Sequence, residues 1–218
     1  MINTTTNDGL HEFVQESLLR RFARTGIRAL DLGSGPGAMA ARLQALGCAV
    51  IAADRDASGF AADLPHRAID FNQPDFASQL GRGFFDLVTA IEVIEHVESP
   101  ISFLRNIGDL LASDGVAILT TPNVDSLPAR LKFFLRGRIR TMDAHGEPTH
   151  ISPIFWDLLV RQYLPLARVR LREHLVFPED GFQLSRPIVA ATLRTAGRAL
   201  GGANLLGDNH ILLLERVS

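Results

Sequence analysis

Three glycines at alternate positions constrain the fold of this chain more than any other feature. Gly33, Gly35 and Gly37 lie in the segment ALDLGSGPG, directly after an apolar run at residues 28–32 and before a helical pattern that ends at Gly47. Glycine permits a sharp turn and close approach of the backbone to a ligand, and the following helix start offers free N–H groups. The segment therefore predicts a strand, a tight turn and a helix, with a ligand at the turn.

Short apolar segments alternate with helical patterns along the first half of the chain. Strands are predicted at residues 28–32, 48–53, 67–70, 85–91 and 115–121, and helices at residues 10–22, 38–46 and 100–111. This alternation is typical of a parallel sheet covered by helices on both faces. In the less regular second half, helices are predicted around residues 154–162 and 186–206, and strands at residues 167–177 and 209–217.

Length, charge and cysteine content narrow the class of protein. The chain has 218 residues, which favours one domain over residues 1–218, and a formal net charge of −2, which gives no general attraction to nucleic acid. The only cysteine is Cys48, so an intramolecular disulfide and a cysteine-based zinc site are excluded. The polar N-terminus lacks a signal-peptide pattern, and no long apolar run suggests a membrane span. A cytoplasmic protein is expected.

Carboxylates near the glycine turn distinguish two classes of cofactor. Gly33, Gly35 and Ala38 also match the dinucleotide pattern G-x-G-x-x-A. Asp31 precedes this turn, where its charge would oppose a pyrophosphate but favour a ligand with an ammonium and a sulfonium group. That points to S-adenosylmethionine. Asp54 ends the second strand, where a carboxylate accepts hydrogen bonds from ribose hydroxyls of either cofactor.

The third predicted strand supplies the adenine contacts. Asp70 follows it and is placed to accept a hydrogen bond from the adenine amino group, while Phe71 or Ile69 is expected to cover the ring. The alternative for Asp54 and Asp70 is a strand-end cap or a solvated carboxylate. The order of these features argues for a class I methyltransferase.

Five motifs carry a resemblance to a known family. ALDLGSGPG, AADRD, IDF, FDLVTAIEVIEHV and GVAILTTPN resemble, over roughly residues 28–123, class I S-adenosylmethionine methyltransferases of the ubiquinone-biosynthesis O-methyltransferase type, in the methyltransferase 11/12/23 group. The resemblance implies an α/β, three-layer Rossmann-like fold with a seven-stranded, mostly parallel sheet whose last strand, at residues 209–217, is antiparallel. Residues 28–123 would form the cofactor-binding half, and residues 124–208 the substrate-side insertions.

The resemblance also implies the cofactor contacts, with S-adenosylhomocysteine as the product. The expected cofactor-binding residues, ordered from the methionine part through ribose and adenine to the sulfonium, are Asp31, Gly33, Ser34, Gly35, Gly37, Asp54, Arg55, Asp70, Phe71 and Ile91.

The segment EVIEH follows the fourth strand at the edge of the expected pocket. On one helical turn Glu92 and His96 would face the same way. A neutral imidazole is suited to remove the proton of an acceptor hydroxyl. His150, in a segment resembling one that follows the fifth strand in such enzymes, is expected to line the acceptor pocket. Glu92, His96 and His150 are therefore the candidate catalytic residues.

A metal-assisted alternative rests on a second resemblance. The E-x-x-E-H pattern with a distant histidine resembles RNA 3′-terminal 2′-O-methyltransferases, which bind a divalent metal; the candidate ligands are Glu92, Glu95, His96 and either His150 or His145. In the simpler interpretation Glu95 caps a helix and His96 is structural or a base. The remaining histidines are expected at the surface: His11, His66, His174 and His210.

A basic segment, LPARLKFFLRGRIR at residues 127–140, has Leu131, Phe134 and Leu135 on one side and five cations around them, without an acid. The simplest expectation is a helix that packs its apolar side on the sheet and leaves a basic face in solvent. The alternatives are a lid over the acceptor site, a patch for a phosphorylated or carboxylated substrate, a membrane-surface helix and an RNA contact.

The sequence thus predicts transfer of a methyl group from S-adenosylmethionine to a small-molecule or lipid-linked acceptor, with oxygen favoured by the EVIEH resemblance. The alternatives are metal-assisted 2′-O-methylation of RNA, a non-catalytic binding module that keeps the fold, and a nicotinamide enzyme, which Asp31 should oppose. Nucleic acid is not the expected partner, and weak contact with a membrane surface is allowed.

Overall fold

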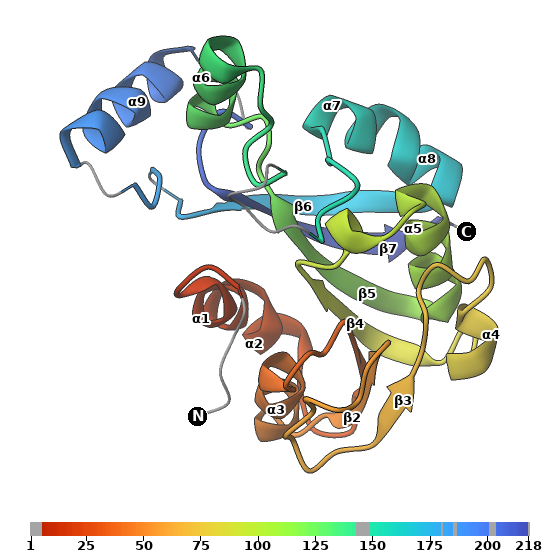
Figure 1. Ribbon diagram of the computed structural model, residues 1–218. Helices are drawn as coiled ribbons and strands as arrows, with labels where there is room; N and C mark the ends of the chain where they lie inside the picture. Colours follow the sequence, from red (N-terminus) through yellow and green to blue (C-terminus); the bar gives the residue numbers. More distant parts are fainter. Residues whose placement is uncertain (1–5, 143–148, 180, 185–186, 201–203, 218) are drawn as a thin grey trace.

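A seven-stranded sheet organises the computed structural model, which describes residues 6–142, 149–179, 181–184, 187–200 and 204–217 (Figure 1). The strands are β1 (Arg28–Leu32), β2 (Ala49–Asp54), β3 (His66–Ala68), β4 (Phe85–Ile91), β5 (Leu111–Pro122), β6 (Val169–Phe177) and β7 (Asn209–Arg216). Their order is β3-β2-β1-β4-β5-β7-β6, and β7 runs antiparallel to both of its neighbours. The expected α/β sheet with an antiparallel last strand is confirmed.

Helical segments connect the strands. They are α1 (Leu10–Val14), α2 (Arg20–Phe22), α3 (Ala38–Ala45), α4 (Ala77–Leu80), α5 (Pro100–Leu110), α6 (Leu127–Arg136), α7 (Trp156–Leu158), α8 (Leu164–Ala167) and α9 (Pro187–Leu200). A π-helical stretch, Gln15–Leu19, joins α1 to α2, and another, Leu159–Tyr163, joins α7 to α8. No helix in these described parts of the chain is long and apolar enough to cross a membrane.

Two apolar clusters bury the two faces of the sheet. On one face, leucines of the α1–α2 segment pack with α3; on the other, α4, α5 and the α7–α8 segment pack over β4 and β5 (Figure 1). Full burial of each large aliphatic or aromatic side chain contributes about 1.5–3 kcal/mol relative to exposure. The expected three layers therefore follow from apolar residues placed at helical spacing on both sides of buried strands.

Helix α5 shows how local sequence sets an element. The Ser99 hydroxyl accepts a hydrogen bond from the Ser102 N–H at 3.3 Å, and Pro100 occupies the first turn, where its missing N–H costs nothing. Phe103 and Ile107 then recur on the buried face. Because Ser99 is the cap, the interpretation of Glu95 as a helix cap is wrong.

Strand β3 is shorter than expected. It ends at Ala68, so Asp70 lies beyond the strand in a turn, where its carboxylate accepts a hydrogen bond from the Asn72 N–H at 3.0 Å. The strand lies at the sheet edge and pairs only with β2 among the described strands. A short edge strand offers few unpaired groups for aggregation.

Two histidines expected at the surface are buried. His11 is 6% exposed and His210 is 0% exposed, whereas His66 and His174 are half-buried. His210 lies on β7, which is enclosed between β5 and β6, and its Nδ1 lies 3.0 Å from Nε2 of His174. Burial lowers the pKa of His174 to about 4 and that of His210 to about 3. Both rings are therefore neutral near pH 7.

Gly33 is required by a close contact as well as by its backbone conformation. Its φ is +68°, and a Cβ there would lie 2.3 Å from Cγ2 of Val93. Gly35 also has positive φ, +48°, but a Cβ there would meet nothing within 4 Å.

We expect Gly33→Ala to lower the free energy of unfolding by at least about 2 kcal/mol, because left-handed strain and overpacking add, and Gly35→Ala to lower it by about 1 kcal/mol from strain alone. Urea titrations of both variants measure the difference. Equal losses in the two variants would contradict the contact with Val93.

Candidate functional site

The glycine turn is held against the end of β2. The backbone N–H groups of Gly33 and Ser34 both donate to the Ala53 carbonyl, at 2.8 and 3.2 Å, and Gly37 N–H donates to the Ser34 carbonyl at 2.8 Å. Gly37, with φ +97°, directly precedes α3. These bonds place the N-terminus of α3 at the carboxyl edge of the sheet, where parallel α/β sheets bind ligands.

A pocket opens at this turn. It is lined by Thr6, His11, Asp31, Gly33, Ser34, Gly35, Pro36, Ala38, Met39 and Ile91. Among the described residues, four of its polar atoms have no hydrogen-bond partner: Asp31 Oδ2, Ser34 Oγ, Thr6 Oγ1 and His11 Nδ1. Buried polar atoms are rarely left unpaired, so these atoms are suited to a polar ligand. A carboxylate beside hydroxyl groups fits the ammonium and carboxylate of a methionine moiety.

Asp31 is the charged group at the centre of this pocket. Its carboxyl is 1% exposed, and Oδ1 accepts a hydrogen bond from the Thr89 hydroxyl at 2.7 Å. Burial raises the pKa of Asp31 to about 7, against the lowering effect of the Thr89 hydrogen bond. A bound cation would favour the ionised form and lower this pKa.

The Asp54 carboxylate lies on the other side of the glycine turn. Its Oδ2 accepts a hydrogen bond from the Gly35 N–H at 2.9 Å, and its Oδ1 accepts one from the Arg55 N–H at 2.6 Å. The carboxylate is thereby held beside the glycines with acceptor capacity left for hydroxyl groups. The Arg55 side chain is exposed to solvent.

The expected adenine contacts differ in their surroundings. Phe71 is half-buried, and its ring packs against the core rings of Phe76 and Phe103 at centroid distances of 5.2 and 5.7 Å. Asp70 is half-buried in its turn, and Ile69 is 5% exposed. The core contacts fix the ring of Phe71 beyond the end of β3.

The expected helical turn from Glu92 to His96 is wrong. Glu92 directly follows β4 and has φ +55°, a strained value for a residue with a side chain, and the 3₁₀ turn comprises only Ile94–His96. The Thr120 hydroxyl donates to Glu92 Oε1 at 3.0 Å and accepts from the Glu92 N–H. Shielding from solvent raises the pKa of Glu92 to about 7. Glu92 therefore faces β5 instead of sharing a helical face with His96.

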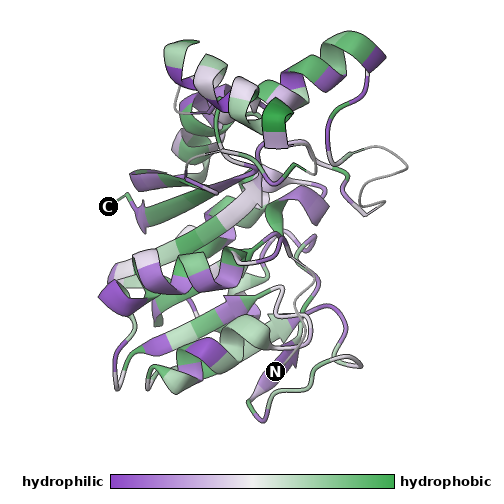
Figure 2. Cartoon of the chain, turned by 90° about the vertical axis from the view of Figure 1, so that its left-hand side faces the viewer, coloured by the Kyte–Doolittle hydropathy of each residue, from purple (hydrophilic) through white to green (hydrophobic). Residues whose placement is uncertain are grey.

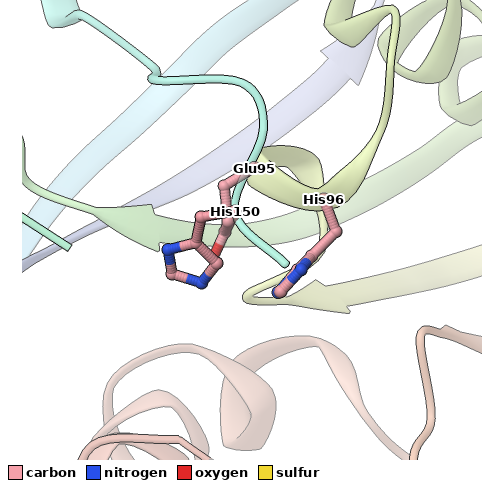
Figure 3. A group of neighbouring side chains, drawn as sticks. All are labelled: Glu95, His96 and His150. Carbon is pink, nitrogen blue, oxygen red and sulfur yellow. The ribbon is translucent and has the colours of Figure 1, made fainter. Parts of the chain in front are cut away.

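Glu95, His96 and His150 converge on the same edge of the sheet (Figure 3). One ligand atom from each lies within 4.8 Å of the others. The Thr121 hydroxyl donates to Glu95 Oε2 at 3.1 Å, while Glu95 Oε1 has no hydrogen-bond partner among the described residues. Burial, followed by the charge of Glu92, raises the pKa of Glu95 well above its ordinary value.

Backbone hydrogen bonds hold His150 next to His96, which lies 54 residues earlier in the sequence. The N–H groups of Ile151 and Ser152 donate to the Glu95 carbonyl at 2.9 and 3.0 Å. The two imidazole centroids are 4.6 Å apart, and His96 Nδ1 lies 3.2 Å from the Thr149 carbonyl oxygen. A carboxyl and two imidazoles form a ligand set that fits a divalent metal. Glu92 lies outside this group, and His145 lies outside the described residues.

Another cavity, of about 940 Å³, lies at the opposite end of the sheet. Arg105, Arg168 and Arg216 contribute to its wall. It is remote from the glycine turn and from the Glu95 cluster, so it has no place in the candidate site.

Comparisons with known proteins agree with this geometry. A family model described as "Methyltransferase domain" matches residues 7–178. The chain belongs to this family. It is a class I S-adenosylmethionine-dependent methyltransferase domain, and the predictions of family and cofactor class are confirmed.

Two curated relatives are named ubiquinone biosynthesis O-methyltransferase. The protein of Caulobacter sp. (strain K31) is 36% identical over 127 residues, covering 51% of this chain and 50% of the relative, and that of Rhodopseudomonas palustris (strain BisB5) is 33% identical over 124 residues, covering 51% and 49%. The chain thus spans about half the length of these relatives.

Solved structures share the fold of this methyltransferase domain at low sequence identity. A SAM-dependent methyltransferase from Archaeoglobus fulgidus has a TM-score of 0.61 at 16% identity and covers 94% of each chain. Burkholderia thailandensis 1,6-didemethyltoxoflavin-N1-methyltransferase, solved with 1,6-didemethyltoxoflavin and S-adenosylhomocysteine, has a TM-score of 0.60 at 14% identity, covering 95% of this chain and 78% of the other.

Sequence reasoning missed His11 and Thr6 as pocket residues. A signal existed for His11, which lies seven residues before Leu18 and three before Val14 and therefore shares the buried face of the first helical segment. Thr6 precedes that segment and carries no comparable pattern. Its place at the pocket depends on how the segment packs against the sheet.

We expect binding of S-adenosylhomocysteine to weaken as the pH falls. Free Asp31 takes up a proton below about pH 7, whereas its contact with the ligand ammonium needs the ionised carboxylate. Affinity should therefore be full above pH 7 and roughly tenfold lower at pH 6 than at pH 8. Isothermal titration calorimetry at both values measures this difference, with Asp31→Asn as the control that should show no such dependence. An unchanged affinity in the wild type would contradict the assignment.

Asp54→Ala should weaken S-adenosylhomocysteine binding by about 1.5–3 kcal/mol for each charge-assisted hydrogen bond lost to a ribose hydroxyl. Asp54→Asn retains one acceptor oxygen for the Gly35 N–H and should lose less. A dissociation constant that neither substitution changes would show that Asp54 does not contact the ligand.

Proposed function

We propose that this domain methylates a hydroxyl oxygen of a small-molecule or lipid-linked acceptor. The observation that carries the proposal is the position of two sites on one sheet edge. The glycine turn with Asp31 lies at the end of β1, and the Glu95, His96 and His150 group follows the neighbouring strand β4. Residues 124–208, which include His150, would select the acceptor.

Bound S-adenosylmethionine supplies an electrophilic methyl group. Asp31 would accept hydrogen bonds from its ammonium, and the unpaired hydroxyls of Ser34 and Thr6 are placed to donate to its carboxylate. Asp54 would bind the ribose, and Asp70 with Phe71 the adenine. These contacts hold the reacting carbon in line with the acceptor, which is the main requirement of methyl transfer.

His96 is the group best placed to remove the acceptor proton. A carbonyl oxygen only accepts hydrogen bonds, so the contact of 3.2 Å between Nδ1 and the Thr149 carbonyl places the imidazole proton on Nδ1. The lone pair of Nε2 is then available as a base. The preference for oxygen is supported by the curated relatives, which are named O-methyltransferases.

A divalent metal bound by Glu95, His96 and His150 is the competing use of these residues, because the single Nε2 lone pair of His96 cannot bind a metal and accept a proton at the same time. It is supported by the convergence of their ligand atoms within 4.8 Å and by the unpaired Glu95 Oε1. A metal at this position would lower the pKa of an acceptor hydroxyl. Metal-assisted methylation of RNA remains the alternative function.

We propose the cytoplasm as the compartment. The support is that the sequence holds a single cysteine, Cys48, and therefore no intramolecular disulfide, a composition that fits a reducing compartment.

Turnover with S-adenosylmethionine and a panel of phenolic and catechol acceptors tests the proposed reaction. His96→Ala should reduce kcat by about 100-fold or more, the usual contribution of a general base, and leave the affinity for S-adenosylhomocysteine unchanged. His66→Ala is the matched control and should leave kcat unchanged. A His96→Ala variant with wild-type kcat would contradict the role of His96.

Metal content gives a separate readout. If the metal occupies this site in place of a general base, then after dialysis against Mn²⁺ or Zn²⁺ the wild type should retain metal and Glu95→Gln should lose it, since a neutral amide is a poorer ligand than a carboxylate. S-adenosylhomocysteine binding should survive in both. Metal-free wild-type protein with full activity would remove the metal from the mechanism and favour His96 as the general base.

A further inference from the structure

The cavity of about 940 Å³ that lies away from the candidate site is formed where α5, α8 and the end of β7 meet (Figure 1). Three arginines line it, and each comes from a different part of the chain: Arg105 from α5, Arg168 directly after α8, and Arg216 from the end of β7. The Val217 N–H donates to the Arg168 carbonyl at 3.0 Å, which holds the last two of these parts together. We call this cavity the arginine cavity.

The arginines of this cavity have no carboxylate partner among the described residues. Arg105 donates from Nη2 to a backbone carbonyl of α8 at 3.3 Å, and neither Arg168 nor Arg216 forms an ion pair within the described parts of the chain. The acidic residue of the lining, Asp109, is bonded to Arg82. Like charges that line one cavity repel one another, and a bound anion removes that repulsion.

Helix α6 is a cationic surface of a different kind. Its apolar side faces solvent, which overturns the expectation that this side packs on the sheet: Phe134 is 84% exposed and Leu135 66% exposed. The helices at the top of Figure 2 accordingly carry strongly hydrophobic and strongly hydrophilic residues together. A guanidinium nitrogen of Arg130 lies 3.6 Å from a carboxylate oxygen of Asp125. In the arginine cavity, by contrast, three cations without such a partner line one cavity.

The backbone conformation of Arg168 sets it apart from an ordinary surface arginine. Its φ is +59°, in the left-handed region that glycine usually occupies at the end of a helix. An arginine at this position carries strain that a glycine would avoid. Gly108 of α5 keeps this region compact, because a Cβ there would lie 2.8 Å from Cγ1 of Val169. The close approach of α5 to the start of β6 brings the arginines to one cavity.

We propose that the arginine cavity binds a small phosphate-bearing anion. A phosphate dianion offers two charges and three terminal oxygens, which suit three guanidinium groups, whereas a carboxylate offers one charge and two oxygens, which a single guanidinium fork satisfies. Leu166 and Val217 add apolar wall for the organic part of a phosphate ester.

Nucleic acid fits this cavity less well than a small anion. The lining contains no aromatic residue among the described residues, so a base would find no stacking surface there. Because the cavity lies at the opposite end of the sheet from the glycine turn, the proposal does not depend on the proposed methyl transfer.

Isothermal titration with pyrophosphate tests the proposal, with S-adenosylhomocysteine present to occupy the glycine turn. The wild type should bind pyrophosphate, with a dissociation constant that rises with salt. Arg168→Gln and Arg216→Gln should each raise this constant about tenfold, because each loses a charge-assisted hydrogen bond. Arg161→Gln is the matched control. It removes the same charge from an arginine that pairs with Asp157 outside the cavity lining, and it should bind like the wild type.

The variant Arg168→Gly separates binding from folding. It removes the left-handed strain together with the side chain, so its midpoint of thermal unfolding should be no lower than that of the wild type, while pyrophosphate affinity falls about tenfold.

The proposal is overturned if the wild type gives no binding heat with millimolar pyrophosphate. It is equally overturned if folded Arg168→Gly and Arg216→Gln bind like the wild type, or if Arg161→Gln weakens binding as much as they do. Acetate that binds as tightly as pyrophosphate would contradict the phosphate class. Retention on RNA without binding of pyrophosphate would assign the cavity to nucleic acid instead.

Discussion

The burial of the Asp31 carboxyl beside the glycine turn is the constraint on which the rest of the site depends. The carboxyl accepts one hydrogen bond from Thr89, and burial raises its pKa from 3.8 to about 7. A shift of this size means that the buried site disfavours the ionised form of the carboxyl, relative to water, by on the order of 4 kcal/mol. A ligand cation offsets that cost only when it lies next to the unpaired Oδ2. The free protein is thus prepared for a cationic ligand at the place where a dinucleotide would bring a pyrophosphate.

The strand order brings this pocket and the group of Glu95, His96 and His150 to the same edge of the sheet. Since β1 lies between β2 and β4, the carboxyl ends of these strands place Asp31 between Asp54 and the segment that follows Ile91. The left-handed backbone of Glu92 ends β4 abruptly, and the 3₁₀ turn after it presents His96. Backbone hydrogen bonds from Ile151 and Ser152 to the Glu95 carbonyl then hold the segment that carries His150 at this edge. The pocket at the glycine turn and the group of Glu95, His96 and His150 therefore lie at one edge of the sheet.

Local sequence was sufficient for the features that depend on neighbouring residues. The glycine turn, most of the buried strands and the start of α5 at Pro100 follow from turn chemistry and apolar spacing, and these were predicted closely. Features that depend on tertiary packing were not. The fully buried His210 reflects the insertion of β7 between two strands, and the outward apolar side of α6 reflects a helix that contacts its neighbours through Ala129 and α9. In α6 the periodicity identified an apolar side but carried no information on which way that side faces.

Isothermal titration of the metal-stripped protein with S-adenosylhomocysteine and, separately, with NADH tests the central claim most directly. The account predicts micromolar binding of S-adenosylhomocysteine and no heat with NADH, because Asp31 favours an ammonium and opposes a pyrophosphate. Binding of NADH without binding of S-adenosylhomocysteine would contradict it and reassign the glycine turn to another ligand.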